Sequence, residues 1–209
     1  MSREFHKPTW FEGHRFDAFL GSEDPARIYA AAHETARTLV ERGREDAGSE
    51  LVERMIAYTD EHGIDTLAEL WATAAAESLP GALWRLYLLR ALVRQDAAAA
   101  ANAFQRGVAA LRTADQAIAG APSPAGPEEV AALADRILRG AFSGDLADAL
   151  HRAAATSRLL AAGTLEEADA SDAAAPARAT AFTTRAARLS TIAAELEAAA
   201  RLSAAGRLD

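Results

Sequence analysis

Apolar residues in this chain recur at helical spacing, and alanine supplies a large share of them. No segment alternates apolar and polar residues as a half-buried strand would. Because the apolar fraction of 50% depends so strongly on alanine, we expect a thin core in which alanine-lined helices approach closely. The sequence therefore predicts an all-α fold, a bundle of about seven to eight helices that follows an N-terminal aromatic arm.

Helix-start and helix-stop residues divide the first half of the chain. Asp24 and Pro25 predict a helix that ends before Gly43. Further helices are expected over 49–62, 65–78, 82–95 and 96–112, the last of them capped by Asp96. The helix over 82–95 is apolar on nearly every side, which indicates that other helices surround it.

The second half begins after a segment rich in proline and glycine. Residues 113–126 are expected to form a linker, and a helix over 127–139 should follow it and end before Gly140. The next helix is predicted over 145–162, with Gly163 as its terminator. The acidic stretch behind Gly163 is either a short helix or a loop, and Pro176 then starts a long terminal helix.

The terminal helix carries apolar residues at alternating spacings of four and three, which is typical of a coiled-coil seam. The seam residues are Phe182, Ala186, Leu189, Ala193, Leu196 and Ala200. Two interpretations remain open, an internal helical hairpin and a homodimer through residues 176–205, and the short run of heptads favours the hairpin. The chain thus divides into an arm (1–22), an N-terminal bundle (23–112), the linker (113–126) and a C-terminal hairpin or bundle (127–209) packed on the first.

The N-terminal arm concentrates aromatic residues, whose large apolar surface favours burial over exposure to water. We expect Trp10, Phe11, Phe16 and Phe19 to bind a partner or to cover the first bundle.

The same arm offers a second hypothesis, a metal site. His6, Glu12, His14 and Asp17 are imidazole and carboxylate ligands of the kind that hold Zn, Mn or Fe. The alternative is that these four are ordinary surface or packing residues.

Charge and residue usage exclude several classes of function. The net charge of −8 provides no overall attraction to nucleic acids or anionic membranes. The chain has no cysteine, which excludes disulfides, thiolate metal sites and cysteine nucleophiles. Lys7, the only lysine, lies in the arm, where it suits neither a phosphate-binding loop nor a Schiff base. Without an apolar leader or membrane span, a cytoplasmic protein is expected.

Catalytic motifs are also missing from the sequence. It has no Glu-x-x-His pair for a di-iron site, no Gly-x-Ser-x-Gly elbow and no Gly-x-Gly-x-x-Gly loop. Asp148 and His151 share a helix face, but such a pair is usually a solvated hydrogen bond. We therefore predict no cofactor and favour a protein that is not an enzyme.

Three arginines project from the apolar helix over 82–95. Because a buried arginine must be paired, Arg85, Arg90 and Arg94 either form salt bridges with neighbouring helices or bind a small anionic ligand.

The segment TLAELWATAAAESLPGALWRLY, residues 66–87, resembles the helix-turn-helix of TetR-type repressors. The resemblance implies DNA binding, with the helix after Pro80 as the recognition helix. The connection is longer than in that motif and lacks its usual glycine, and the second helix is very apolar for a groove-reading element.

The stretches FEGHRFDAFLGSEDP, YTDEHGID and SLPGALWRLYLLR resemble a group of small actinobacterial-type helical proteins of unassigned role, some of which carry the label RNA polymerase β subunit. The resemblance implies a self-standing all-helical family and assigns no functional residues. Our leading hypothesis is a non-enzymatic interaction or scaffold protein that binds a protein partner. The alternatives are a transcription-associated regulator and a helical enzyme that binds a small ligand or a metal.

Overall fold

A computed structural model describes residues 25–45, 53–54, 57, 61, 65–171 and 174–209. Within these ranges the chain forms helices and no strand, which confirms the all-α prediction. The helices are α2 (Pro25–Glu45), α4 (Asp65–Trp71), α5 (Leu79–Gln95), α6 (Ala97–Ala110), α7 (Asp115–Ala119), α8 (Pro127–Ser143), α9 (Leu146–Ser171) and α10 (Pro176–Ala204). The helix expected over 49–62 lies mostly outside the described residues.

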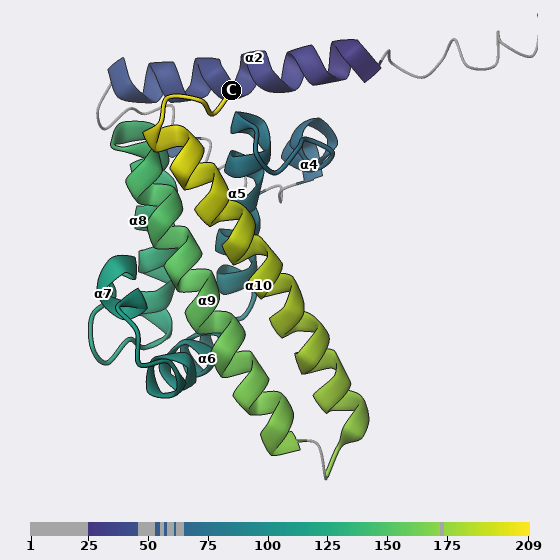
Figure 1. Cartoon of the computed structure of the whole chain (residues 1–209), viewed down its shortest axis with the longest axis vertical. Coiled ribbons are helices and arrows are strands. Elements are labelled where there is room, and N and C mark those ends of the chain that lie inside the picture. Colours follow the sequence, from purple (N-terminus) through teal and green to yellow (C-terminus); the bar gives the residue numbers. More distant parts are fainter. Residues whose placement is uncertain (1–24, 46–52, 55–56, 58–60, 62–64, 172–173) are drawn as a thin grey trace, which may run out of the picture.

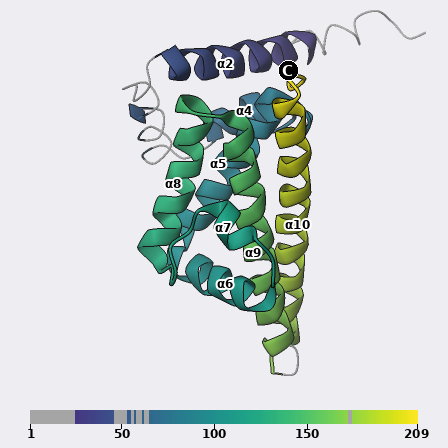
Figure 2. The same ribbon diagram turned by 60° about the vertical axis from the view of Figure 1, so that its left-hand side comes forward.

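The helices are arranged around a long antiparallel hairpin. Helices α9 and α10 pack along each other, and α5, α6, α7 and α8 contact α9 (Figure 1). Helix α2 lies across one end of the bundle, and the opposite end of the hairpin projects beyond α6 in both views (Figures 1 and 2). The last residues return to the start of α5, where the backbone N–H of Leu79 donates to an oxygen of Asp209 at 2.6 Å.

A single hydrophobic cluster joins the helices on both sides of segment 113–126. Its largest fully buried side chains include Trp71, Tyr87, Phe104 and Phe142. Alanines fill much of the remainder, in agreement with the expected thin core. Since small side chains contribute little area each, close backbone approach has to supply much of the packing.

Glycines provide this close approach between α6 and α9. A Cβ atom at Gly163 would lie 1.7 Å from the backbone oxygen of Ala103, and one at Gly107 would lie 1.9 Å from that of Leu159. The prediction that a helix ends at Gly163 is therefore wrong, because this glycine packs against α6 and α9 continues to Ser171. The acidic stretch that follows Gly163 is helical as far as Ser171.

Two other helices also continue past their expected glycine terminators, and at Gly43 the cause is again close packing. A Cβ atom at Gly43 would lie 2.8 Å from the Cβ of Phe142, so α2 passes through this glycine and ends at Glu45. Helix α8 passes through Gly140, where a new Cβ would lie 3.9 Å from the nearest atom, and ends at Ser143.

The connection between α4 and α5 differs from the expectation of a helix up to Ser78. Helix α4 ends at Trp71. The hydroxyl of Ser78 instead caps α5, since it accepts a hydrogen bond from the backbone N–H of Gly81 at 3.3 Å and donates one to the carbonyl of Ala75 at 2.7 Å. Ser78 therefore serves the start of a helix rather than the end of one.

Of the other expected signals, the Asp96 cap is confirmed, the helix expected from residue 82 begins earlier, at Leu79, and Asp24 lies outside the described residues. Asp96 accepts a hydrogen bond from the backbone N–H of Ala99 at 2.9 Å and caps α6. Helix α6 ends at Ala110, slightly earlier than expected. The segment 113–126 contains the short helix α7, and Asp115, Ala119 and Ala125 within it are buried.

The terminal helix starts at Pro176, as predicted. Its seam packs inside the chain, on α9, which is the hairpin interpretation. The buried seam residues are Ala186, Leu189, Ala193, Leu196 and Ala200, with Phe182 partly buried.

Across the described part of the chain, we find no helix with the length and apolar character needed to cross a membrane.

Candidate functional site

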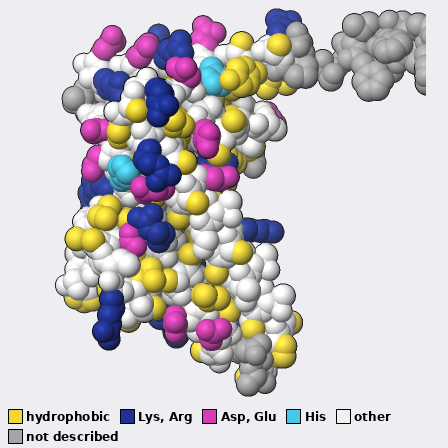
Figure 3. All heavy atoms as spheres, viewed as in Figure 1, with side chains coloured by type: hydrophobic (Ala, Val, Ile, Leu, Met, Phe, Trp, Pro, Cys, Tyr) yellow, Lys and Arg dark blue, Asp and Glu magenta, His cyan; other side chains and the backbone are white. Residues whose placement is uncertain are grey.

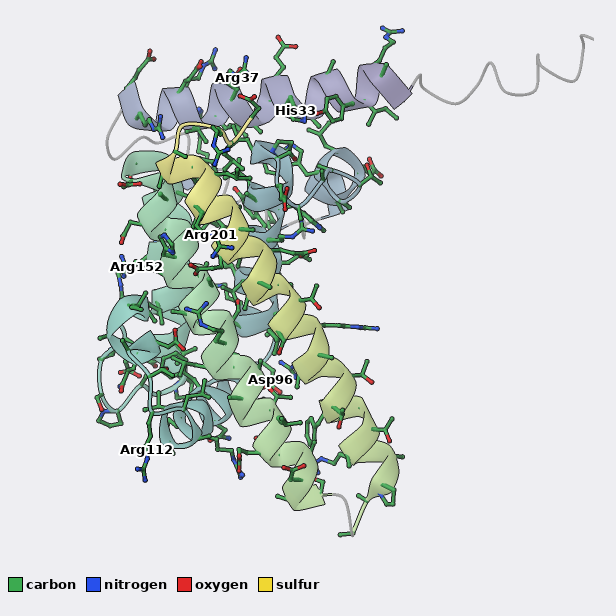
Figure 4. The ribbon with its side chains drawn as sticks, in the orientation of Figure 1. His33, Arg37, Asp96, Arg112, Arg152 and Arg201 are labelled. Atoms are coloured by element: carbon green, nitrogen blue, oxygen red, sulfur yellow. The ribbon has the colours of Figure 1, made fainter. Side chains whose placement is uncertain are left out.

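A network of charged side chains joins α7, α9 and α10 on one side of the hairpin. Its centre is Glu197 of α10, whose carboxylate lies 3.4 Å from His151 Nδ1, 3.5 Å from Arg158 Nη1 and 3.7 Å from Arg201 Nη1. Basic, acidic and histidine side chains are mixed on this face (Figure 3), and Arg152 and Arg201 lie on it (Figure 4). Three cationic or potentially cationic groups thus share one carboxylate.

Arg158 extends the network to a buried carboxylate on α7. Its Nε and Nη2 atoms donate to one oxygen of Asp115 at 2.9 and 2.6 Å, and the hydroxyl of Thr113 donates to the other oxygen at 2.9 Å. Burial alone would raise the pKa of Asp115, but the hydrogen bonds from Arg158 and Thr113 outweigh burial and lower this pKa. Asp115 is therefore ionised in the folded protein at neutral pH.

Arg152 ties the end of α7 to α9. Its Nε donates to the carbonyl of Ala119 at 3.3 Å, and Nη1 lies 3.9 Å from Asp148. Gly120 ends α7 in the left-handed conformation, with φ of 71°, and a Cβ there would lie 2.8 Å from Arg152 Nη2. Glycine is thus favoured at this position by its backbone conformation, whereas the flexible end of the Arg152 side chain could move to admit a Cβ atom.

The geometry defines what the network can do chemically. A carboxylate beside an imidazole is the arrangement that orients a general base, but Arg158 and Arg201 share the carboxylate of Glu197 with His151. The arrangement therefore fits a structural role, in which the ion pairs hold α9 and α10 together, better than it fits a catalytic pair. The Asp148–His151 spacing noted in the sequence has a different outcome, since His151 pairs with Glu197 and Asp148 with Arg152.

The sequence did not single out Glu197, Arg158, Asp115 or Arg201. An acidic and a basic residue on separate helices cannot be recognised as an ion pair from the sequence, because their pairing depends on the register between the helices.

The three arginines singled out on α5 all meet carboxylates. Arg85 Nε lies 2.6 Å from Glu195 of α10, while Arg90 Nε and Arg94 Nη1 lie 2.7 and 3.0 Å from the two oxygens of Asp135 on α8. The structure therefore brings Arg90 and Arg94 together and directs Arg85 to a different helix. A small anion would have to displace Asp135 from Arg90, whose side chain is only 5% exposed; an anion site here remains a prediction.

A second ion pair lies near this one on α8. Arg139 contacts Glu53 through two hydrogen bonds, at 2.6 and 3.1 Å. The hydrogen bond with Arg139 lowers the pKa of Glu53, although burial partly opposes the effect. Both side chains are well exposed, so the pair contributes little to stability.

Four buried polar atoms have no hydrogen-bond partner among the described residues. They are His33 Nε2, Trp71 Nε1, Tyr87 Oη and Ser157 Oγ. The rings of Trp71 and Tyr87 are 6.1 Å apart, and Tyr87 lies 6.5 Å from the ring of Phe142. Burial raises the pKa of Tyr87, against a smaller opposing effect of Arg90, so its phenol stays neutral.

The proposed metal ligands His6, Glu12, His14 and Asp17 lie outside the described residues. The same holds for the expected partner-binding residues Trp10, Phe11, Phe16 and Phe19. Both hypotheses therefore remain predictions.

The helix expected to read DNA is largely inside the bundle. Most of α5 is buried, including Leu83, Trp84 and Tyr87. A recognition helix presents its side chains to the major groove, so α5 could do this only by leaving the core.

The projecting end of the hairpin has charges placed against the helix macrodipoles. Glu166, Glu167 and Asp169 lie near the C-terminal end of α9, and Arg178 lies in the first turn of α10. Negative charge is unfavourable near a helix C-terminus and positive charge near an N-terminus, each by about 0.3 to 1 kcal/mol at exposed positions. Arg106 offsets one of these charges through Glu167, at 3.7 Å. The guanidinium of Arg178 lies 5.1 Å from the centre of the Phe182 ring, a local contact that offsets its unfavourable position. Local helix stability thus does not account for Asp169, which lies in the last turn of α9.

Comparisons of the chain with protein-family models, with curated proteins and with solved structures gave no significant match.

Proposed function

We propose that this chain is a non-enzymatic interaction or scaffold protein that presents the projecting end of the α9–α10 hairpin to a protein partner. The observation that carries the proposal is the group of acidic side chains at the projecting end of α9, Glu166, Glu167 and Asp169. Asp169 lies in the last turn, where the helix dipole disfavours negative charge. Residues that reduce local stability are expected where function requires them. Charged groups at a protein interface contribute to partner choice and to the association rate.

The remainder of the hairpin supports this role because it is firmly held. The seam of α10 is buried on α9, and Glu197 of α10 forms ion pairs with His151 and Arg158 of α9. A surface carried by rigid helices loses little conformational entropy on binding. Leu165, with 47% of its surface exposed on α9, adds an apolar contact at this end.

Affinity purification with the full chain tests the proposal. The parent and the variant Glu166→Arg/Asp169→Arg are used to capture proteins from the native cell, and mass spectrometry identifies what is bound. We expect at least one protein that the parent enriches specifically and that the variant does not.

The matched control is Glu34→Arg/Glu41→Arg, which makes the same change in net charge on exposed residues of α2. Equal capture by the parent and by both variants would contradict the proposal. Recovery of RNA polymerase subunits would instead favour the transcription-associated alternative.

A further inference from the structure

One face of α5 is only partly covered by α10. Arg85 points to α10 through its ion pair with Glu195, and Leu88 and Leu92 follow it at spacings that keep them on the same face. Both leucines are partly exposed, whereas Leu86 and Leu89 beside them are buried. Helix α10 contacts the beginning of this face at Arg85, and Leu88 and Leu92 pack against the core but keep part of their surface exposed.

Helix α10 has a matching stripe that starts from the same ion pair. Ile192, Arg188 and Arg185 lie three, seven and ten residues before Glu195, so the four residues share one side of the helix. Ile192 packs against the core and is partly exposed, and Arg188 is exposed. Because α5 and α10 contact each other and are joined by the Arg85–Glu195 pair, helical spacing places the two stripes on neighbouring parts of the two helices. We call this surface, with Leu88, Leu92 and Ile192 as its apolar part and Arg185 and Arg188 as its basic part, the α5–α10 face.

The positive charge at this border is not neutralised within the described chain. Residues 176–194 contain three arginines and no Asp or Glu. Among the described residues, Arg185 and Arg188 form no ion pair, whereas Arg85, Arg90 and Arg94 on α5 all do. In a protein of net charge −8, this is a local surplus of positive charge beside an apolar stripe.

We infer that the α5–α10 face binds an acidic amphipathic helix of the protein partner. An amphipathic helix places apolar side chains on a partly exposed apolar surface through positions i, i+3, i+4 and i+7, and carboxylates on its flank complement Arg185 and Arg188. This inference rests on the proposed function, because it specifies the chemistry of a partner.

Charge and burial distinguish this occupant from nucleic acid. Phosphates would be attracted to the arginines, but Leu88, Leu92 and Ile192 would gain nothing from them. A long polyanion would also meet the overall negative charge of the protein. A short helix with an apolar face uses both halves of the surface.

The test measures fluorescence anisotropy with two labelled model peptides of about 18 residues, or about five helical turns. Both peptides have leucines at i, i+3, i+4 and i+7, and their flanks carry glutamates in one and lysines in the other. The parent should bind the glutamate peptide about tenfold more tightly than the lysine peptide, and the preference should weaken as salt is raised. A labelled DNA duplex is the third probe, and it should bind more weakly than the glutamate peptide.

The variant Arg185→Glu/Arg188→Glu should reverse the preference and select the lysine peptide. The control Arg112→Glu/Arg136→Glu makes the same change in net charge at exposed arginines elsewhere and should keep the parent's preference. If the double variant does not fold, as judged by circular dichroism, Arg188→Glu alone should still reduce the parent's preference for the glutamate peptide.

A parent that binds both peptides equally, that prefers lysine, or that prefers DNA would overturn the inference. An unchanged preference in the folded Arg185→Glu/Arg188→Glu variant would also overturn it. These outcomes are measured separately from the capture experiment at Glu166 and Asp169, so a failure of this inference can be distinguished from a failure of the proposed function.

Discussion

Arg158 of α9 donates two hydrogen bonds to a single oxygen of Asp115, at 2.9 and 2.6 Å, and so anchors the short helix α7 to the hairpin. The carboxylate is buried, while about a third of the arginine side chain is exposed. The pair thus holds α7, which lies in the proline- and glycine-rich segment 113–126, against the hairpin.

The Asp115–Arg158 pair predicts a dependence of stability on pH. The pKa of Asp115 is lowered in the folded state, so the pair stabilises the fold above the unfolded-state pKa of about 3.9 and this contribution is lost as pH falls through the folded-state value. We expect Asp115→Asn to lower the free energy of unfolding at pH 7 by about 1 to 3 kcal/mol. The difference from the parent should shrink as pH decreases from about 5 to 3.

Urea denaturation at several pH values measures this effect. Asp148→Asn is the control, because Asp148 is 66% exposed and lies 3.9 Å from Arg152. It should change stability by less than about 0.5 kcal/mol. A constant difference between parent and Asp115→Asn across this pH range would contradict the explanation.

Asp135 is expected to be essential for stability because it faces a buried arginine. Asp135→Ala takes away the carboxylate bound by Arg90, and removal of one partner of a buried pair costs about 3 to 5 kcal/mol. Arg94→Ala removes an ion pair whose arginine side chain is 42% exposed, and it should cost about 1 kcal/mol or less. Thermal or chemical unfolding would measure both, and equal effects would contradict the distinction drawn from burial.

Gly163 should tolerate no side chain. In Gly163→Ala the new Cβ would lie 1.7 Å from the backbone oxygen of Ala103, so α6 and α9 must separate, at a cost of about 1 to 3 kcal/mol or more. At Gly140, also inside a helix, the nearest atom to a new Cβ is the Cβ of Ala149 at 3.9 Å. Gly140→Ala should therefore stabilise the protein by about 0.4 to 1 kcal/mol. Melting temperatures should shift in opposite directions.

Ser157 offers a test of the unpartnered buried hydroxyl. Its Oγ is buried on α9 without a hydrogen-bond partner among the described residues. Ser157→Ala should leave stability unchanged or raise it by about 1 kcal/mol, because it removes a desolvated polar group that gains nothing in return. Thr164→Val is the comparison, since the hydroxyl of Thr164 donates to the carbonyl of Leu160 at 2.7 Å. A loss of stability in Ser157→Ala equal to that in Thr164→Val would show that Ser157 does have a partner.

The helical class, and the residues at which several helices begin, follow from local sequence signals. Pro25, Pro127 and Pro176 start α2, α8 and α10, and Asp96 caps α6, because these signals act within a single turn of backbone. The seam of α10 was also visible, since its spacing depends only on helical geometry.

Whether a helix ends at a glycine or continues through it depends on the packing of neighbouring helices. Gly43, Gly140 and Gly163 all looked like terminators, yet each lies inside a helix. At Gly43 and Gly163 a second helix lies too close for a Cβ atom. A glycine permits both a left-handed terminus and close packing, and only the position of the neighbouring helix selects between them.

The same reason applies to the charged residues. Arg85, Arg90 and Arg94 were recognisable as cations on an apolar helix, but their carboxylates, Glu195 and Asp135, come from other helices. The Glu197 network and the α5–α10 face likewise depend on register between α5, α7, α9 and α10. Local sequence fixes which residues share a helix face, whereas the packing of the helices fixes what that face meets.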